Sequence, residues 1–122
     1  MSYDKDNIFA KIIRGEIPCD KIYEDDFVLS FKDIRPQAPF HALIIPKGNY
    51  LDINDFSLNA SDNEIIGFNR AIAKVADMLG ISENSGGNGY RVIANAGNDA
   101  HQEVPHPVSY THLTLPTSSV VE

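Results

Sequence analysis

The chain has 122 residues, 43% of them hydrophobic, and a formal net charge of −7, which together suit one globular domain. The acidic balance disfavours general nucleic-acid binding, because that mode needs a basic surface to neutralise phosphates. No apolar run is long enough to span a bilayer, and the N-terminal MSYDKDNIFAK lacks the apolar stretch of a signal peptide, so we expect a cytoplasmic protein without a membrane partner.

The first half of the chain predicts a short helix followed by three strands. Asn7–Arg14 has apolar residues at helical spacing, with Asn7 as a plausible N-cap and Gly15 as a stop. Three runs have the composition of strands, namely Lys21–Glu24, Phe27–Lys32 and His41–Pro46. Alternation within the second run places Phe27, Leu29 and Phe31 on one face.

The second half predicts one long helix and two further strands. Ser61–Leu79 carries an apolar stripe at helical spacing, and Ser61 with Glu64 forms a capping box. Tyr90–Asn95 is the next strand, and Glu103–His106 begins another. The short loops between the early strands favour antiparallel pairing. We therefore expect an α+β fold in which the long helix covers one face of an antiparallel sheet.

The stretch Gly97–His106 (GNDAHQEVPH) contains the polar loop between the last two predicted strands and the start of the second of them. A tight polar loop that ends on a histidine holds an imidazole beside backbone N–H groups. Such groups can bind a phosphate even in an acidic protein. We expect no metal site from His101 and His106, because the sequence offers no third ligand. We also expect no cofactor.

Several stretches occur in a characteristic order: Ile8–Phe9, Lys11–Pro18 (KIIRGEIP), Tyr23–Asp26 (YEDD), Asp33–Lys47 (DIRPQAPFHALIIPK) and Gly89–His106. Together they resemble the histidine triad (HIT) family, in particular its Hint-like branch. The resemblance implies a five-stranded antiparallel sheet with helices, usually paired as a homodimer. It also implies a purine nucleotide ligand and hydrolysis or transfer of a nucleoside monophosphate through a covalent nucleotidyl-histidine. The implied substrates are AMP phosphoramidates, dinucleoside polyphosphates and related adenylates.

The family motif is His-x-His-x-His, which at strand spacing puts three imidazoles on one face. Neutral imidazole is a nucleophile near pH 7 and, once phosphorylated, a good leaving group. His106 matches the first histidine of the motif, whereas Val108 stands at the middle position and Tyr110 at the third. Valine has no nucleophile. The resemblance therefore implies an enzyme family, but this chain is not expected to complete the reaction.

The resemblance also implies roles for residues outside the triad. His41 would support the triad, and Asn95 would contact phosphate or align the nucleophile. Asp33 would accept hydrogen bonds from the ribose hydroxyls. The remaining residues would line the purine cleft (Ile8, Phe9, Phe31 and Ile34) or face phosphate (Gln102 and Glu103). Judged without the resemblance, the four apolar residues are ordinary core, His41 is a core histidine and Asn95 is a turn residue.

The sequence after Pro107 departs from the family. Val108–Thr117 reads VSYTHLTLPT, which resembles the conceptual translation of a transposase-based sequencing adapter. We therefore interpret residues 1–107 as a HIT domain truncated within its triad, and residues 108–122 as a non-native tail. The last strand would then be incomplete or foreign. Two other readings stay open, a non-catalytic nucleotide-binding module and a fragment that does not fold stably.

Overall fold

A computed structural model of the chain describes residues 3–32, 41–100, 102, 104–107 and, for the backbone alone, 109–112. Its strands form one sheet in the order β1-β2-β3-β5-β4, and every neighbouring pair is antiparallel. The strands are β1 (Lys21–Glu24), β2 (Val28–Lys32), β3 (His41–Pro46), β4 (Arg91–Ile93) and β5 (Ser109–His112). The predicted α+β class with an antiparallel sheet is confirmed.

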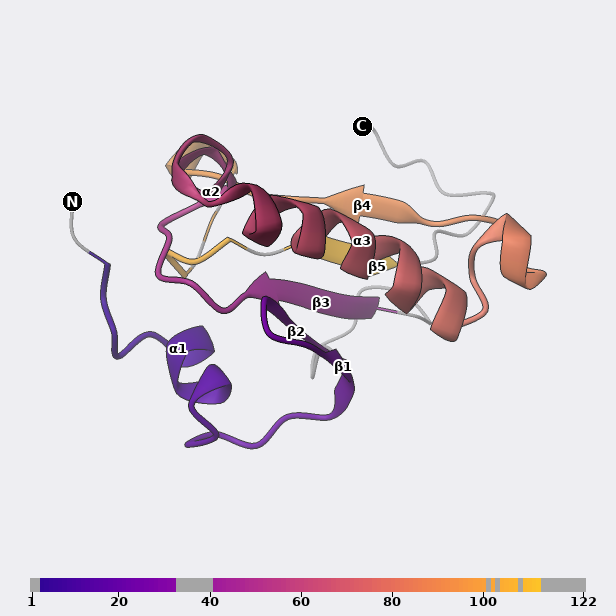
Figure 1. Cartoon of the computed structure of the whole chain (residues 1–122), viewed down its shortest axis with the longest axis horizontal. Helices are drawn as coiled ribbons and strands as arrows, with labels where there is room; N and C mark the ends of the chain where they lie inside the picture. Colours follow the sequence, from indigo (N-terminus) through magenta and orange to yellow (C-terminus); the bar gives the residue numbers. More distant parts are fainter. Residues whose placement is uncertain (1–2, 33–40, 101, 103, 108, 113–122) are drawn as a thin grey trace.

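The helices lie on both faces of this sheet (Figure 1). The long helix α3 (Asp62–Met78) runs across one face, and the short α1 (Ile8–Ile13) lies against the other. A further helix, α2 (Ile53–Asn59), lies near the start of α3, and two 3₁₀ turns follow at Glu83–Ser85 and Asn98–Ala100. None of the helices in the described part of the chain has both the length and the apolar character needed to cross a membrane.

Side chains of β2 and β3 alternate between two cores, as the pleat of a strand requires. The core under α2 and α3 contains Val28, Ala42, Ile44, Phe56, Phe68, Ala71 and Val75. The core under α1 contains Phe9, Leu29, Phe31, Leu43 and Ile45. Strand β3 contributes side chains to both cores, and all six of its residues are buried.

One predicted face needs correction. Leu29 and Phe31 share the α1 core, but Phe27 packs against the α3 core. Phe27 precedes β2 and belongs to a turn in which its N–H donates to the Asp25 carboxylate at 2.8 Å. Since the turn breaks the alternation, Phe27 does not follow the strand period.

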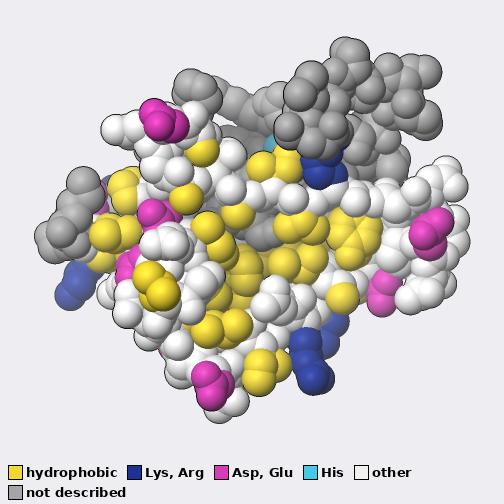
Figure 2. Space-filling model, turned by 90° about the horizontal axis from the view of Figure 1, so that it is seen from above, with side chains coloured by type: hydrophobic (Ala, Val, Ile, Leu, Met, Phe, Trp, Pro, Cys, Tyr) yellow, Lys and Arg dark blue, Asp and Glu magenta, His cyan; other side chains and the backbone are white. Residues whose placement is uncertain are grey.

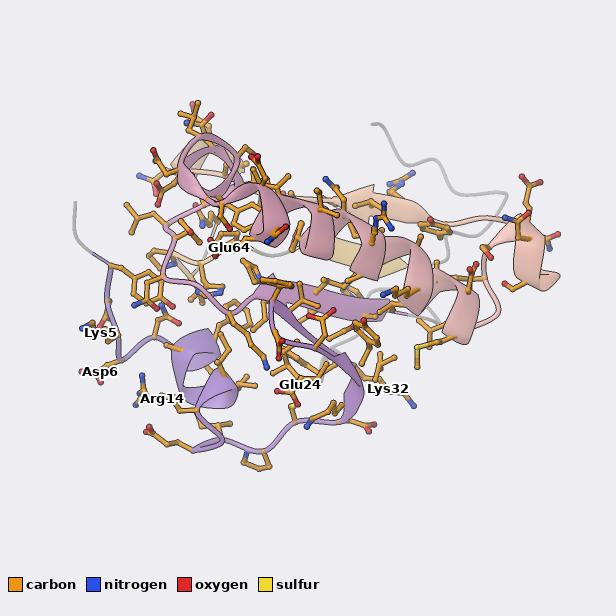
Figure 3. The ribbon with its side chains drawn as sticks, in the orientation of Figure 1. Lys5, Asp6, Arg14, Glu24, Lys32 and Glu64 are labelled. Carbon is orange, nitrogen blue, oxygen red and sulfur yellow. The ribbon has the colours of Figure 1, made fainter. Side chains whose placement is uncertain are left out.

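The capping box that predicted α3 is present. The Glu64 N–H donates to Ser61 Oγ at 3.2 Å, and the Ser61 N–H donates to Glu64 Oε1 at 3.1 Å. Glu64 stands at the N-terminal end of α3, where Figure 3 labels it, and it also accepts a hydrogen bond from the Tyr50 hydroxyl. The helix ends before Gly80, which adopts a left-handed φ of 72°.

Helix α2 was not predicted. Asp52 caps it by accepting from the Asp55 N–H at 2.7 Å, and Phe56 is the one residue of this helix that is buried. Phe56 packs edge-on against Tyr50 with ring centroids 5.3 Å apart. A helix of two turns with a single buried residue shows no repeating apolar stripe, so the sequence pattern could not reveal it.

The predicted start of the last strand was also wrong. Val104–His106 forms a bend, in which the His106 N–H donates to the Val104 carbonyl at 2.7 Å. The strand β5 begins at Ser109 and so falls within the segment interpreted above as a tail. The two prolines on either side of His106 explain the difference, because a proline cannot donate to a sheet ladder.

Candidate functional site

Three aromatic side chains meet on the α1 face of the sheet. Phe9 of α1 lies with its ring centroid 6.3 Å from that of Phe31 and 5.9 Å from that of His106. Phe9, Phe31 and His106 come from α1, β2 and the bend before β5, so the fold brings together residues that are far apart in sequence. Phe9 and Phe31 belong to the same hydrophobic core as Leu43 and Ile45 of β3.

His106 is the polar centre of this cluster and is only 1% exposed. Its Nε2 lies 2.8 Å from the Pro46 carbonyl oxygen and its Nδ1 lies 2.6 Å from the Tyr3 hydroxyl. A carbonyl only accepts, so Nε2 carries the ring proton, and Nδ1 therefore accepts from the Tyr3 hydroxyl. Burial lowers the pKa of His106 to about 4, against the opposing effect of its hydrogen bond to Pro46. The ring is neutral at pH 7, and each of its nitrogens makes a hydrogen bond within the protein.

His41 lies at the other end of the same strand. It opens β3 and is 8% exposed, whereas Pro46, the partner of His106, ends β3. Five residues of extended chain separate the two positions by roughly 16 Å. The structure therefore does not place His41 beside His106. The antiparallel register pairs the backbone of Tyr110 with Leu43, so position 110 lies between them along the sheet.

Gln102 holds the loop that follows β4. Its side-chain amide donates to the Leu51 carbonyl at 2.8 Å and to the Val104 carbonyl at 3.1 Å. Its Oε1 accepts from the Gly97 N–H at 2.8 Å, and Gly97 has a φ of 81°. These bonds fasten the loop to the segment before α2. A phosphate contact by Gln102 stays a prediction, as does one by Asn95, which is half-buried two residues after the end of β4.

The other predicted residues have mixed placements. Ile8 is 44% exposed, whereas Phe9 and Phe31 are buried. Asp33, Ile34, Glu103 and Val108 lie outside the described residues. Within the part of the chain that is described, no group of three or more His, Cys, Asp or Glu residues could hold a metal ion.

The sequence did not predict either hydrogen-bond partner of His106. Pro46 contributes its backbone carbonyl, which carries no side-chain signature. Tyr3 is 103 residues away in sequence and belongs to no recognisable motif. Neither could have been found without the tertiary structure.

Comparison with known proteins decides the family. A family model described as the HIT domain matches residues 14–107. The chain belongs to the HIT family. It is 45% identical to the purine nucleoside phosphoramidase of Escherichia coli K12 over 103 residues, which cover 84% of this chain and 82% of the relative. It is also 52% identical to an uncharacterized HIT-like protein of Azospirillum brasilense over 86% of this chain and 83% of the relative.

Solved HIT structures have the same fold. A HIT family hydrolase from Clostridium thermocellum superposes with a TM-score of 0.83 at 36% identity, covering 98% of this chain and 99% of that one. A histidine triad nucleotide-binding protein from Candida albicans gives a TM-score of 0.74 at 30% identity, covering 95% of this chain and 85% of the other. The described part of this HIT chain thus has the fold of its relatives.

Proposed function

We propose that residues 1–107 derive from a Hint-like HIT enzyme that hydrolyses AMP phosphoramidates or related adenylates, dinucleoside polyphosphates included. The observation that carries this proposal is the buried, neutral His106 packed against Phe9. A histidine at the first triad position thereby lies beside Phe9, one of the residues that the family resemblance assigns to the purine cleft. The similarity to a purine nucleoside phosphoramidase supports the substrate class.

The proposed reaction has two displacements. An imidazole nitrogen at position 108 forms a bond to the α-phosphorus while the phosphorus–nitrogen bond to the amine breaks, and a neighbouring group protonates the leaving amine. Water then attacks the nucleotidyl-histidine, which releases AMP and restores the imidazole. His106 does not attack in this scheme, because both of its ring nitrogens are engaged. It holds the start of the strand that carries the nucleophile.

This chain has valine at the nucleophile position, and we propose that residues 108–122 are translated adapter sequence. The extent of the family match, which reaches residue 107, supports this interpretation. Sequencing the source locus tests it, and a natural gene that encodes VSYTHLTLPT would contradict it. On this proposal the chain itself is not an active hydrolase.

A second candidate function is nucleotide binding without catalysis. The aromatic cluster of Phe9, Phe31 and His106, together with the Pro46 carbonyl, is built from residues that precede position 108. Binding therefore does not require the missing nucleophile. The predicted ribose acceptor Asp33 and the supporting His41 would belong to the same module.

We further propose that the protein is a cytoplasmic homodimer, as the family resemblance implies. Figure 2 shows hydrophobic side chains gathered on the face that carries α3. Large apolar residues exposed in this region of the chain are Ile66 and Met78 on α3, and Tyr90 and Val92 at β4. A second copy of the chain would cover such a surface.

Hydrolysis of a fluorogenic adenosine phosphoramidate tests the proposed enzyme function. We expect no turnover from the present chain, and clear turnover once residues 108–122 are replaced by a tail with the full triad and its apolar, glycine-rich continuation. The matched control carries asparagine in place of the middle histidine and should be inactive. Equal activity with and without that histidine would contradict the proposed nucleophile.

A further inference from the structure

The segment Tyr3–Asn7, here called the N-terminal strap, follows a fixed path beside α1. The Asn7 side-chain amide donates to the Asp4 carbonyl at 2.9 Å, and the Arg14 guanidinium donates to the Lys5 carbonyl at 2.7 Å. Figure 3 labels Lys5 and Asp6 on the strap and Arg14, the C-cap residue of α1, close to them. A hydrogen bond within the strap and one from the C-cap residue of α1, Arg14, therefore help to determine where the strap lies.

Asn7 connects the strap to the helix itself. It is only 8% exposed, and its Oδ1 accepts from the Ala10 N–H at 2.8 Å as the N-cap of α1. The next residue but one is Phe9, which packs against His106. One continuous segment thus supplies both Tyr3 and Phe9 to the same imidazole.

Tyr3 meets His106 in two ways. Its hydroxyl lies 2.6 Å from Nδ1, and its ring stands edge-on to the imidazole with centroids 5.6 Å apart. Burial raises the pKa of the Tyr3 hydroxyl, so this group keeps its proton at neutral pH and donates it to the bond. The imidazole is consequently held between a tyrosine from the strap and a phenylalanine from α1.

We propose that Tyr3 is a positioning residue that fixes the ring orientation of His106, and through His106 the start of the triad strand; its bearing on turnover rests on the proposed function. A half-turn of the imidazole would exchange each nitrogen with a ring carbon. Both hydrogen bonds would then be lost at once, which leaves one allowed orientation. Position 108 follows only two residues later in the sequence, so on the proposed function the orientation of this ring bears on the nucleophile through the short backbone segment that joins them.

The test is ¹⁵N NMR of the His106 ring in the full chain and in its Tyr3→Phe variant. Loss of the hydroxyl should move the Nδ1 resonance downfield, toward the value of an imidazole nitrogen without a donor, while Nε2 stays protonated against Pro46. The matched control is Tyr23→Phe. Tyr23 lies on β1, and its hydroxyl donates to the Asp25 carboxylate at 2.8 Å. The control should leave both His106 resonances unchanged. An unchanged Nδ1 resonance in Tyr3→Phe would overturn the proposal.

A second variant keeps the proposal testable if Tyr3→Phe folds poorly. Arg14→Gln loosens the strap without touching Tyr3 or His106, and it should broaden or shift the Nδ1 resonance in the same direction. No change in Arg14→Gln, with a folded spectrum, would contradict the role of the strap.

The kinetic readout uses the tail-replaced chain. Tyr3→Phe should lower kcat roughly three- to tenfold with KM little changed, because a lost neutral hydrogen bond affects alignment rather than binding. An unchanged kcat in an active tail-replaced chain would overturn the positioning role. If the tail-replaced chain is inactive while the NMR change is present, the proposed function fails and the Tyr3–His106 anchor stands.

Discussion

A chain in which both Val108 and Tyr110 are replaced by histidine is expected to hydrolyse the adenosine phosphoramidate about 100-fold more slowly than the tail-replaced chain. Restoring the side chains does not restore the backbone that aims them. A nucleophile displaced by about 1 Å can cost on the order of 100-fold in rate. The strand β5 begins only at Ser109, the family match ends at residue 107, and we propose that the segment from position 108 onward is foreign to the family.

The comparison requires that both proteins be folded, which circular dichroism and gel filtration establish before the rates are measured. The tail-replaced chain with asparagine at the middle histidine gives the background rate. Turnover by the double variant that equals the tail-replaced chain would show that the present tail supports catalysis, and that only the two side chains are at fault.

The free energy of unfolding is expected to fall by roughly 3 kcal/mol between about pH 6.5 and pH 4 because of His106. Its pKa is lowered from 6.5 to about 4 in the folded chain. As pH falls through this window, the unfolded chain binds the proton before the folded chain does, and unfolding is favoured. Above pH 7 both states are neutral, so the full contribution of the buried neutral ring is present there.

Urea unfolding at a series of pH values measures this effect. Carboxylates such as Glu24, whose pKa is lowered to about 2 by Lys21 and Lys47, lose their stabilising contribution at more acidic pH. The slope between about pH 5 and 6.5, which lies above the ordinary pKa of a carboxyl group, is therefore largely due to histidine. The matched variant His106→Gln keeps a neutral amide and should lose most of the slope. An equal slope in that variant would show that another group titrates.

Elements defined by local signals could be predicted from the sequence. The strand His41–Pro46 has the predicted bounds, and α3 begins after the predicted cap Ser61. Both depend on residues close together in the chain, where spacing and capping determine the structure. Helix α2 has a local cap in Asp52 but no apolar stripe, since its one buried residue, Phe56, packs against the rings of Tyr50 and Phe68.

The candidate site was predictable only in part. Phe9 and Phe31 have the same apolar character whether they form core or cleft, so the family resemblance alone could assign them to a ligand. Phe9 packs against His106, and that ring is anchored by Tyr3 and Pro46 through hydrogen bonds that span 103 and 60 residues of sequence. Such contacts follow from the packing of α1 against the sheet and leave no periodic trace in the sequence.

We propose that this HIT chain retains a purine nucleotide site although valine stands at the nucleophile position. The most direct measurement is thermal unfolding of the present chain with and without AMP, with inorganic phosphate as the control ligand. We expect one cooperative transition that moves to higher temperature with AMP, since a ligand at 100 times its Kd stabilises the folded state by about 2.7 kcal/mol. A cooperative transition that AMP leaves in place would contradict the nucleotide site, and a flat melt would show a fragment that does not fold.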